Sequence, residues 1–372
     1  LDWDGWTAYE QQISIWVASG VAPDVVLIPY YALPALVESD ALLPVDDLIE
    51  RDGAGFGYDD FVSVAKQATQ WDQKTWGLPY DLSLWWNNYN ADAFADAGTA
   101  DPGQLLDAGN WTWDAMITAA HKLTQTAPDG STKQWGLLTF AGDGGIYPWL
   151  WGYGGALLSA DHSRAEVASA ASVEGLTNLH DLIYKEKVLT FPVWSGIPVA
   201  APDGTMAQGR GVMQLWWSNL IGDYTQPGAT WHADQAPLPP GPASPFTGPA
   251  QIHTVAVMKQ SKNVQAAWTF AKFITGKEAY AQAMKESPGF VPVRQSLLST
   301  YSAIEAQSGV RGTRFFNQGL AGTRLLPRAV QMAKIESLKS SLLGRVWKDQ
   351  AAAKGQAEEL ARQIDLLLGA KS

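Results

Sequence analysis

The chain of 372 residues is long enough for two domains with separate cores, and its 46 % hydrophobic and 17 % charged residues are typical of a folded globular protein. Its net charge of −11 repels phosphate backbones, and no basic stretch offsets this charge, so nucleic acid is not an expected partner. The chain has no cysteine, which excludes disulfides, thiolate metal sites and cysteine nucleophiles and fits an exported bacterial protein.

Helical and strand patterns alternate along the first part of the chain. Apolar residues recur at helical spacing over residues 6–19, and Gly20 ends that helix. The apolar run 25–28 then predicts an interior strand of a parallel sheet. A further helix and a hairpin are expected at 59–69 and 71–76. This alternation predicts an α/β fold for the first lobe.

The remaining chain contains more helices, expected at 113–123, 173–184, 264–274 and 351–368. Thr112 and Asn263 stand where they would cap two of these helices. Residues 227–249 contain seven prolines, which neither a helix nor a central strand accepts, so this segment is expected to be a crossover or an edge. A strand is expected to follow over 252–258.

Tryptophan is the most over-represented residue type, with 18 in the chain. Several tryptophans form adjacent pairs, such as Trp85-Trp86 and Trp216-Trp217. A core built on helical or strand periodicity uses one residue of each pair, so the other indole is expected to have a second role.

Six short motifs occur in an order that resembles the extracellular solute-binding protein family, which includes maltose and maltodextrin receptors. The resemblance extends over essentially the whole chain. The motifs are 15–26 (IWVASGVAPDVV), 77–79 followed by Tyr89-Asn90, 110–114 (NWTWD), 206–213 (MAQGRGVM), 261–270 (SKNVQAAWTF) and 289–294 (GFVPVR).

This resemblance implies the two-lobed α/β fold of type II periplasmic binding proteins, with a hinge and a cleft between the lobes. Lobe I is expected to comprise 1–81 and 252–296, and lobe II 82–251 and 297–372. The family normally has a strand, a helix and a second strand before the segment that begins here at Leu1, so the sequence is expected to lack its first stretch.

The resemblance also implies a function. The chain is expected to act as an extracytoplasmic receptor, either periplasmic or lipid-anchored at the outer face of the cytoplasmic membrane. It would work as a monomer that closes around a carbohydrate and delivers it to the membrane permease of an ABC importer.

Aromatic residues supply the first candidate ligand groups. A sugar presents hydroxyls around its rim and C–H groups on its faces, so a receptor needs aromatic platforms beside polar groups. Trp216 and Trp217 are platform candidates because the equivalent segment of the family reaches the cleft; the alternative is that both pack in the core. The glycine-flanked loop 142–155 adds the candidates Asp143, Tyr147 and Trp151.

A second group of candidates lies near the expected crossover. Strand alternation places Asp81, Ser83 and Trp85 on one side of an extended segment, where the carboxylate could accept sugar hydroxyls or serve as a hinge or capping group. Tyr30 and Tyr31 follow a predicted strand at its carboxyl end, where open α/β sheets place ligands.

Two further candidates come from later segments. Gly248 resembles the backbone of the family's return crossover and is expected to approach the ligand closely. Arg324 and Arg328 are candidate hydrogen-bond donors to the ligand, although surface arginines are more often simply solvated. Asp24 is expected to be a structural acid in a turn.

Signatures of catalysis are lacking from the sequence. The five histidines do not occur at metal-binding i, i+4 spacing, and HExxH, GxSxG and P-loop motifs are missing, so neither an enzyme nor a cofactor is predicted. A secreted carbohydrate-active enzyme remains an alternative, since glycosidase clefts also combine aromatic platforms with carboxylates. Another alternative is a receptor of the same fold for a polyol, a glycerophosphodiester or a peptide.

Overall fold

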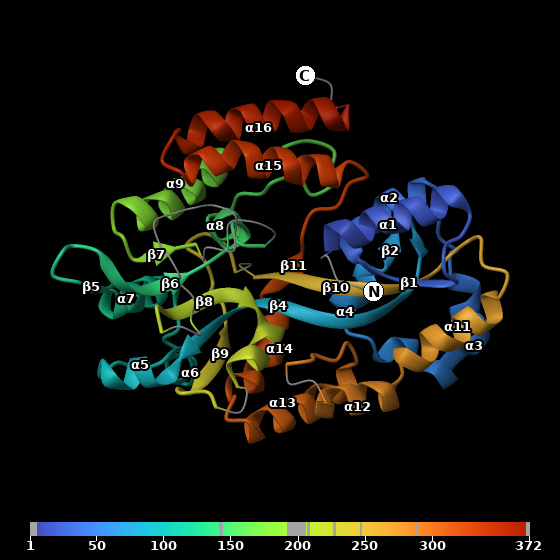
Figure 1. The fold of residues 1–372 in the computed structure, drawn as a ribbon, viewed down its shortest axis with the longest axis horizontal. Coiled ribbons are helices and arrows are strands. Elements are labelled where there is room, and N and C mark those ends of the chain that lie inside the picture. The colour runs from blue at the N-terminus through green and yellow to red at the C-terminus, as the bar shows by residue number, and fades with distance from the viewer. Residues whose placement is uncertain are drawn as a thin grey trace. The chain divides into compact units, whose positions relative to one another are not determined.

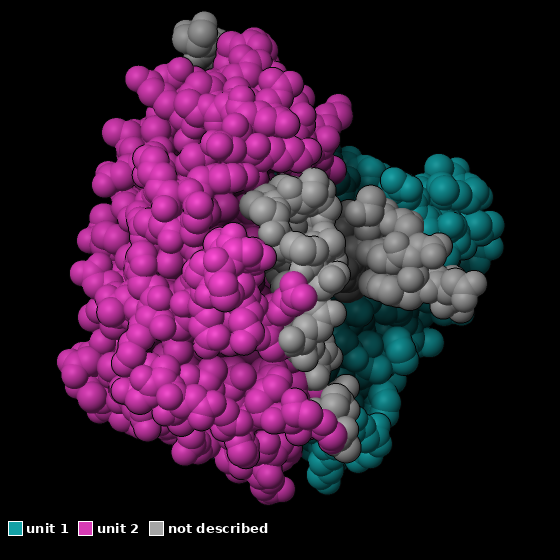
Figure 2. Space-filling model, turned by 60° about the vertical axis from the view of Figure 1, so that its left-hand side comes forward, with its two compact units in different colours: residues 1–83, 251–301, 328–332 teal, residues 84–250, 302–327, 333–372 magenta. Residues whose placement is uncertain are grey.

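The computed structural model describes residues 6–140, 144–191, 206, 209–225, 228–245, 248–286 and 289–369. By its internal contacts the chain divides into two compact units (Figure 2). Unit 1 comprises 1–83, 251–301 and 328–332, and unit 2 comprises 84–250, 302–327 and 333–372. The short return to unit 1 at 328–332 has no counterpart in the division expected from the sequence.

Unit 1 is built mainly from residues 1–83 and 251–301, whose elements are labelled in Figure 1. Its helices are α1 (Trp6–Ser19), α2 (Leu33–Glu38), α3 (Asp46–Phe56), α4 (Ser63–Ala68), α11 (Val264–Ile274), α12 (Lys277–Glu286) and the start of α13 (Leu298–Gln307). Its strands are β1 (Val25–Pro29), β2 (Gln70–Trp71), β3 (Lys74–Thr75) and parts of β4 (Leu78–Asn90) and β10 (Gly248–Val257).

The core of unit 1 forms where α1 packs on the strand that follows it. Ile13 of α1 and Val26 and Ile28 of β1 are buried in one hydrophobic cluster. Gly20 ends α1 in the left-handed region, with a φ of 70°, as the sequence predicted. The expected helix over 59–69 is shorter, because a 3₁₀ turn (Tyr58–Asp60) precedes α4.

The prediction for β1 is wrong in two respects. Its paired neighbour β10 runs antiparallel, with Val25 opposite Val257 and Pro29 opposite His253. In addition, β1 does not bury every residue, since Val25 and Leu27 are half-buried. A run of apolar residues specifies a buried strand without specifying the direction of its neighbour, which is set by long-range pairing.

Unit 2 contains the larger share of the chain. Its helices are α5 (Ala91–Asp96), α6 (Pro102–Asp107), α7 (Trp113–Leu123), α8 (Tyr147–Gly152), α9 (Ala170–Tyr184), α10 (Ile221–Tyr224), α14 (Phe316–Ala321), α15 (Met332–Val346) and α16 (Ala353–Leu368). Its strands are β5 (Gln125–Thr126), β6 (Thr132–Leu138), β7 (Leu189–Thr190), β8 (Gly211–Trp217), β9 (Ala233–Pro237), β11 (Thr323–Leu325) and the remaining parts of β4 and β10.

The sheet of unit 2 is mixed. β4 pairs antiparallel with both β8 and β9, while β8 pairs parallel with β6. The proline-rich segment contributes the short strand β9, which ends at Pro237. On this sheet Gly136 allows close packing of α7, because a Cβ there would lie 1.9 Å from the carbonyl oxygen of Ala120.

Helix caps are partly as predicted. Thr112 caps α7 by accepting a hydrogen bond from the amide of Ala115 at 3.1 Å, which confirms that prediction. Asn263 occupies the capping position of α11, but its side chain makes no cap bond and instead donates to Asp24. Asp24 also accepts a bond from the hydroxyl of Ser261, so this carboxylate holds two side chains of the segment before α11.

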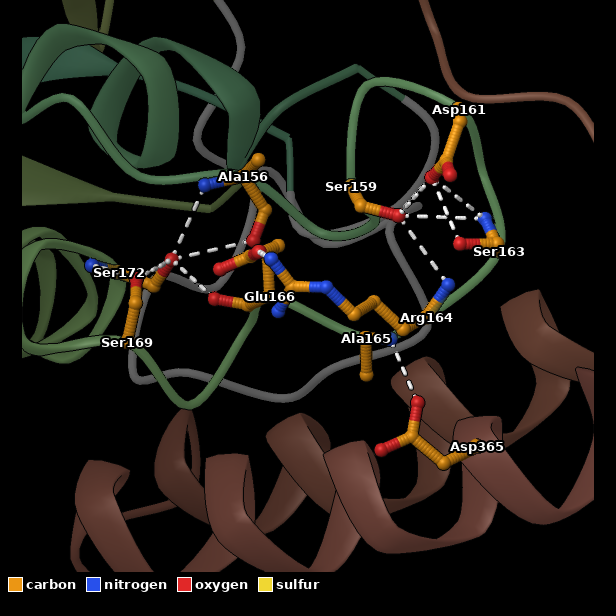
Figure 3. Close-up of polar contacts among 10 residues, drawn as sticks. All are labelled: Ala156, Ser159, Asp161, Ser163, Arg164, Ala165, Glu166, Ser169, Ser172 and Asp365. Carbon is orange, nitrogen blue, oxygen red and sulfur yellow. Dashed lines mark hydrogen bonds and ion pairs between the residues drawn. The ribbon is translucent and has the colours of Figure 1, made fainter. Parts of the chain in front are cut away.

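A polar network fixes the loop that leads into α9 (Figure 3). Asp161 accepts bonds from the hydroxyls of Ser159 and Ser163, which hold the pKa of Asp161 at about 2. The amide of Ala165 donates to Asp365 of α16 at 2.7 Å, so the loop is fastened to the last helix. A single carboxylate thus joins two segments that are distant in the sequence.

Acid sensitivity of unit 1 should depend on Asp52. Hydrogen bonds from Arg51, Lys272 and Trp268 hold the pKa of Asp52 well below its ordinary value. A lowered folded-state pKa adds stability above the unfolded value of about 3.9, and this stability is lost as the pH falls further. We expect Asp52→Asn to lower the Tm at pH 7, with the difference from wild type narrowing below about pH 4. A constant difference across a calorimetric pH series would contradict this assignment.

Candidate functional site

An aromatic cluster on unit 2 follows from the register between β4 and β8. This pairing places Trp85 opposite Trp217 and Trp86 opposite Trp216. The ring of Trp85 lies 4.8 Å from that of Trp217 at an interplanar angle of 85°, and 5.2 Å from that of Trp216. Phe140 meets Trp216 edge to face at 4.4 Å. We call Trp85, Trp216, Trp217 and Phe140 the tryptophan cluster.

Members of the tryptophan cluster differ in exposure. Trp85 is completely buried and Trp216 is 7 % exposed, whereas Trp217 is half-buried. Of the three tryptophans in the cluster, Trp217 is therefore the most exposed to solvent. The ring of Trp85 packs against that of Trp217 and fixes its orientation, because an edge-to-face pair holds both rings in a defined geometry.

Gly144, in the glycine-flanked segment, lies against this cluster. A Cβ on Gly144 would lie 2.7 Å from Cε3 of Trp85 and 2.9 Å from Cγ of Pro249, so only glycine fits between them. Gly144 therefore lies directly against Trp85. Asp143, the acidic candidate of the same loop, lies outside the described residues.

Tyr147 and Trp151 are neighbours on one face of α8, with ring centroids 4.9 Å apart. Both rings are buried, since Tyr147 has no exposed surface and Trp151 is 3 % exposed. The guanidinium of Arg324 lies 4.2 Å from the ring centroid of Trp151, and the ammonium of Lys339 lies 5.3 Å from that of Tyr147. Two cations thus lie over the rings of two residues that the sequence predicted to contact the ligand.

These two cations differ in their access to solvent. Lys339 is 1 % exposed and forms an ion pair with Glu336, so it belongs to the interior of unit 2. Arg324 is exposed and extends from β11, where it is paired with Pro249 of β10. Of these two cations, Arg324 is the one whose residue is exposed.

Gly248 lies against the backbone of β4. A Cβ on Gly248 would lie 3.0 Å from the carbonyl oxygen of Trp85. The carbonyl of Gly248 accepts a hydrogen bond from the hydroxyl of Thr323. A small hollow of about 80 Å³ opens beside it on unit 2. The lining includes Trp85, Trp86, Gly248, Gln318 and Thr323.

Candidates of unit 1 occupy two places. Tyr30 is completely buried and Tyr31 is half-buried, with rings 6.0 Å apart at an angle of 71°. The Nη1 atom of Arg328 donates to the carbonyls of Ala68 and Gln70 at 3.2 and 2.9 Å. Arg328 therefore binds backbone within its own unit, and Tyr31 is the more accessible of the two tyrosines.

The carboxylate of Asp81 is engaged by a histidine. Nδ1 of His253 lies 2.7 Å from both carboxylate oxygens, and the amide of His253 donates to Oδ1 at 2.9 Å. This geometry fits the alternative in which Asp81 serves the crossover rather than a ligand. Ser83, two residues further along β4, is half-buried.

Sequence reasoning missed Phe140, Lys339 and Gln318. Phe140 stands just before the glycine-flanked loop and shortly after the apolar pair Leu137-Leu138, and that position is a usable signal. Lys339 and Gln318 carry no such signal, because each lies in a helix far along the chain from the aromatic residues it approaches.

Metal chemistry has no support in the described part of the chain. Among these residues, no group of three or more histidine, aspartate or glutamate side chains is placed to hold a metal ion. No described helix combines the length and apolar character needed to cross a membrane.

A family model described as bacterial extracellular solute-binding protein matches residues 4–307. The chain belongs to this family. Its members deliver a solute to an ABC transporter, so the protein is an extracytoplasmic solute-binding receptor. In sequence, the receptor is 24 % identical over 295 residues to a binding protein of Brucella abortus, a match that covers 78 % of this chain and 67 % of that protein.

Solved structures confirm the α/β fold of type II periplasmic binding proteins. An ABC substrate-binding protein from Listeria monocytogenes, in complex with cycloalternan, matches with a TM-score of 0.85 and 21 % identity over 99 % of this chain and 90 % of that chain. UgpB from Mycobacterium tuberculosis, in complex with glycerophosphocholine, matches with a TM-score of 0.81 and 19 % identity over 99 % of this chain and 89 % of that chain.

The difference in exposure between Trp216 and Trp217 predicts a difference in how much each contributes to stability. Trp216→Ala removes an almost fully buried indole, so we expect a loss of about 3–5 kcal/mol in the free energy of unfolding. Trp217→Ala should cost clearly less, because this residue is already partly exposed to water. Urea denaturation of both variants measures the difference, and equal losses would contradict the burial assigned to the two rings.

Proposed function

We propose that this receptor binds a carbohydrate through Trp217 and Arg324 of unit 2, together with Tyr31 of unit 1, and delivers it unchanged to the permease. The observation that carries this proposal is the half-buried ring of Trp217, held edge to face by the buried Trp85. A flat indole presented in a fixed orientation is the surface on which the C–H face of a sugar stacks.

Arg324 supplies the polar complement to this platform. Its guanidinium lies on the ring of Trp151 and is exposed, so its N–H groups are oriented before a ligand arrives. Sugar hydroxyls accept hydrogen bonds from such a group, and a charged donor makes these bonds stronger than neutral ones. Fixing both groups in advance reduces the entropy lost on binding.

Closure around the ligand is the proposed signal to the permease. A ligand that contacts both units favours the closed state, which is what the permease would recognise. Moving the ratio of closed to open forms from 1:99 to 99:1 requires a preference of about 5.5 kcal/mol, within reach of one stacked ring and several charge-assisted hydrogen bonds.

A glycerophosphodiester is the second candidate ligand. The specific observation in its favour is the cationic character beside α8, where the exposed Arg324 accompanies the aromatic face. A phosphate group pairs with guanidinium in a bidentate manner, which a neutral sugar cannot do. The UgpB complex with glycerophosphocholine shows that this fold accommodates such a ligand in another protein.

We propose no catalytic activity. Glycosidases need two carboxyl groups on either side of the scissile bond, and the acidic candidate Asp81 is already bonded to His253. The receptor would therefore release its ligand chemically intact.

A thermal-shift screen tests the ligand class. The panel contains mono- and oligosaccharides, polyols and glycerophosphocholine. A carbohydrate at one hundred times its Kd should stabilise the receptor by about 2.7 kcal/mol. Stabilisation by glycerophosphocholine alone would favour the second candidate. Steady appearance of cleavage products in chromatograms of the same mixtures would instead establish an enzyme.

A matched pair of variants tests the site. Trp217→Ala should abolish the stabilisation by the ligand found in the screen, because it removes the stacking surface. Trp231→Ala is the control, since Trp231 is also a half-buried tryptophan of unit 2 but packs against Tyr224 away from the cluster. Calorimetric titration should give unchanged binding for this control. Equal affinity of both variants would remove Trp217 from the site.

A further inference from the structure

A row of amide side chains crosses the sheet of unit 2. The strand register places Asn88 of β4 opposite Gln214 of β8 on one side and opposite Gln235 of β9 on the other. Side chains of directly paired residues point to the same face of a sheet, with Cβ atoms about 4.5–5.5 Å apart. The three side chains therefore lie next to one another on one face. We call Asn88, Gln214 and Gln235 the amide row.

The amide row is buried in unit 2. Asn88 and Gln235 have no exposed surface, and Gln214 is 2 % exposed. Asparagine is depleted in strands, and asparagine and glutamine are mostly exposed in proteins, because a buried amide loses its hydrogen bonds to water. Three amides at one level of a sheet therefore require hydrogen-bond partners in the interior of the unit.

A protein partner is present at one end of the row. The hydroxyl of Tyr224 donates to Oε1 of Gln214 at 2.7 Å. Among the described residues, by contrast, neither amide atom of Asn88 and neither amide atom of Gln235 has a hydrogen-bond partner. The backbone beside Asn88 is already engaged, because β4 is paired on both edges at this level. Four buried polar atoms on two neighbouring side chains thus need a partner from outside the chain.

The position of these four atoms indicates a bridged pair. Asn88 and Gln235 are directly opposite each other, yet no hydrogen bond joins their side chains. Polar groups that are close but do not meet are commonly bridged by an ordered water molecule. Folded proteins hold about one buried water per 27 residues, and such waters bind buried polar groups that lack a protein partner.

The donors and acceptors of the row select the ligand. Each amide has an oxygen that accepts hydrogen bonds and an NH2 group that donates them. A cation would satisfy only the oxygens and an anion only the NH2 groups, and either would bring a charge into a buried place that offers neutral groups. Water donates and accepts at once. We propose that the amide row is a binding site for internal water, which bridges the side chains of Asn88 and Gln235.

This site attaches β9 to the sheet more firmly. β9 comes from the proline-rich segment, and β4 is the strand with which it pairs among those described. Water bound between Asn88 and Gln235 joins the two strands through their side chains as well as through their backbones. The site lies inside unit 2 and does not depend on the ligand proposed above.

Magnetic relaxation dispersion of the water nuclei measures the site in solution, because its amplitude counts water molecules held inside a folded protein. Asn88→Leu and Gln235→Met replace each amide by an apolar side chain of similar size. The double variant makes the bridged pair apolar, and apolar cavities stay dry, so its amplitude should fall by the equivalent of about one water molecule. Each single variant should lose the same water, so the two losses should not add.

Gln134→Met is the matched control. Gln134 is also a glutamine on a strand of unit 2, but its side-chain amide donates to the carbonyl of Leu123 at 2.8 Å. Its replacement should therefore leave the amplitude at the wild-type value. Circular dichroism melting curves check that the variants are folded.

A high-resolution crystal structure of the wild-type protein tests the same site without any substitution. Density for a water molecule within hydrogen-bond distance of both Asn88 and Gln235 is expected. The proposal is overturned by a direct hydrogen bond between the two amides, by an ion in this place, or by a dry gap. An unchanged dispersion amplitude in the folded double variant, or an equal loss in Gln134→Met, would overturn it as well.

Discussion

The register between β4 and β8 is the constraint on which the candidate site depends. It places Trp85 opposite Trp217 and thereby decides which indole is buried and which is half in water. A slip of one residue would exchange the two faces of the strand and remove Trp217 from its place opposite Trp85. Gly144 reinforces this arrangement, because the loop it belongs to fits over Trp85 only without a side chain at that position.

The abundant aromatic residues divide into a buried scaffold and a small accessible surface. Trp85, Tyr147 and Trp151 are buried and act by orienting their neighbours, either through ring contacts or by supporting a cation. Trp217 and Arg324 are the groups that these buried rings present to solvent. In the proposed site, binding would cost little entropy, since both groups are already ordered by packing.

Two pairs of aspartate and histidine with nearly the same geometry illustrate how context assigns a role. Asp92 and His232 join neighbouring segments within unit 2, where the histidine side chain is 86 % exposed. Asp81 and His253 join the strands that connect the units and are mostly buried. The same bonds are weaker in water than in a buried position, so the second pair is suited to hold the backbone.

Local sequence patterns determined several helix ends and the family, and they pointed to the segments of the candidate site, because caps, glycine stops and apolar periodicity act over a few residues. The cap by Thr112 and the stop at Gly20 are examples. The sequence did not determine the direction of the strand paired with β1, the capping role of Asn263 or the partner of Asp81. Arg324 reaches Trp151, and His253 reaches Asp81, only after the chain folds back on itself. Tertiary structure alone decided these contacts, since residues so distant in the sequence are brought together by sheet pairing, which no local pattern encodes.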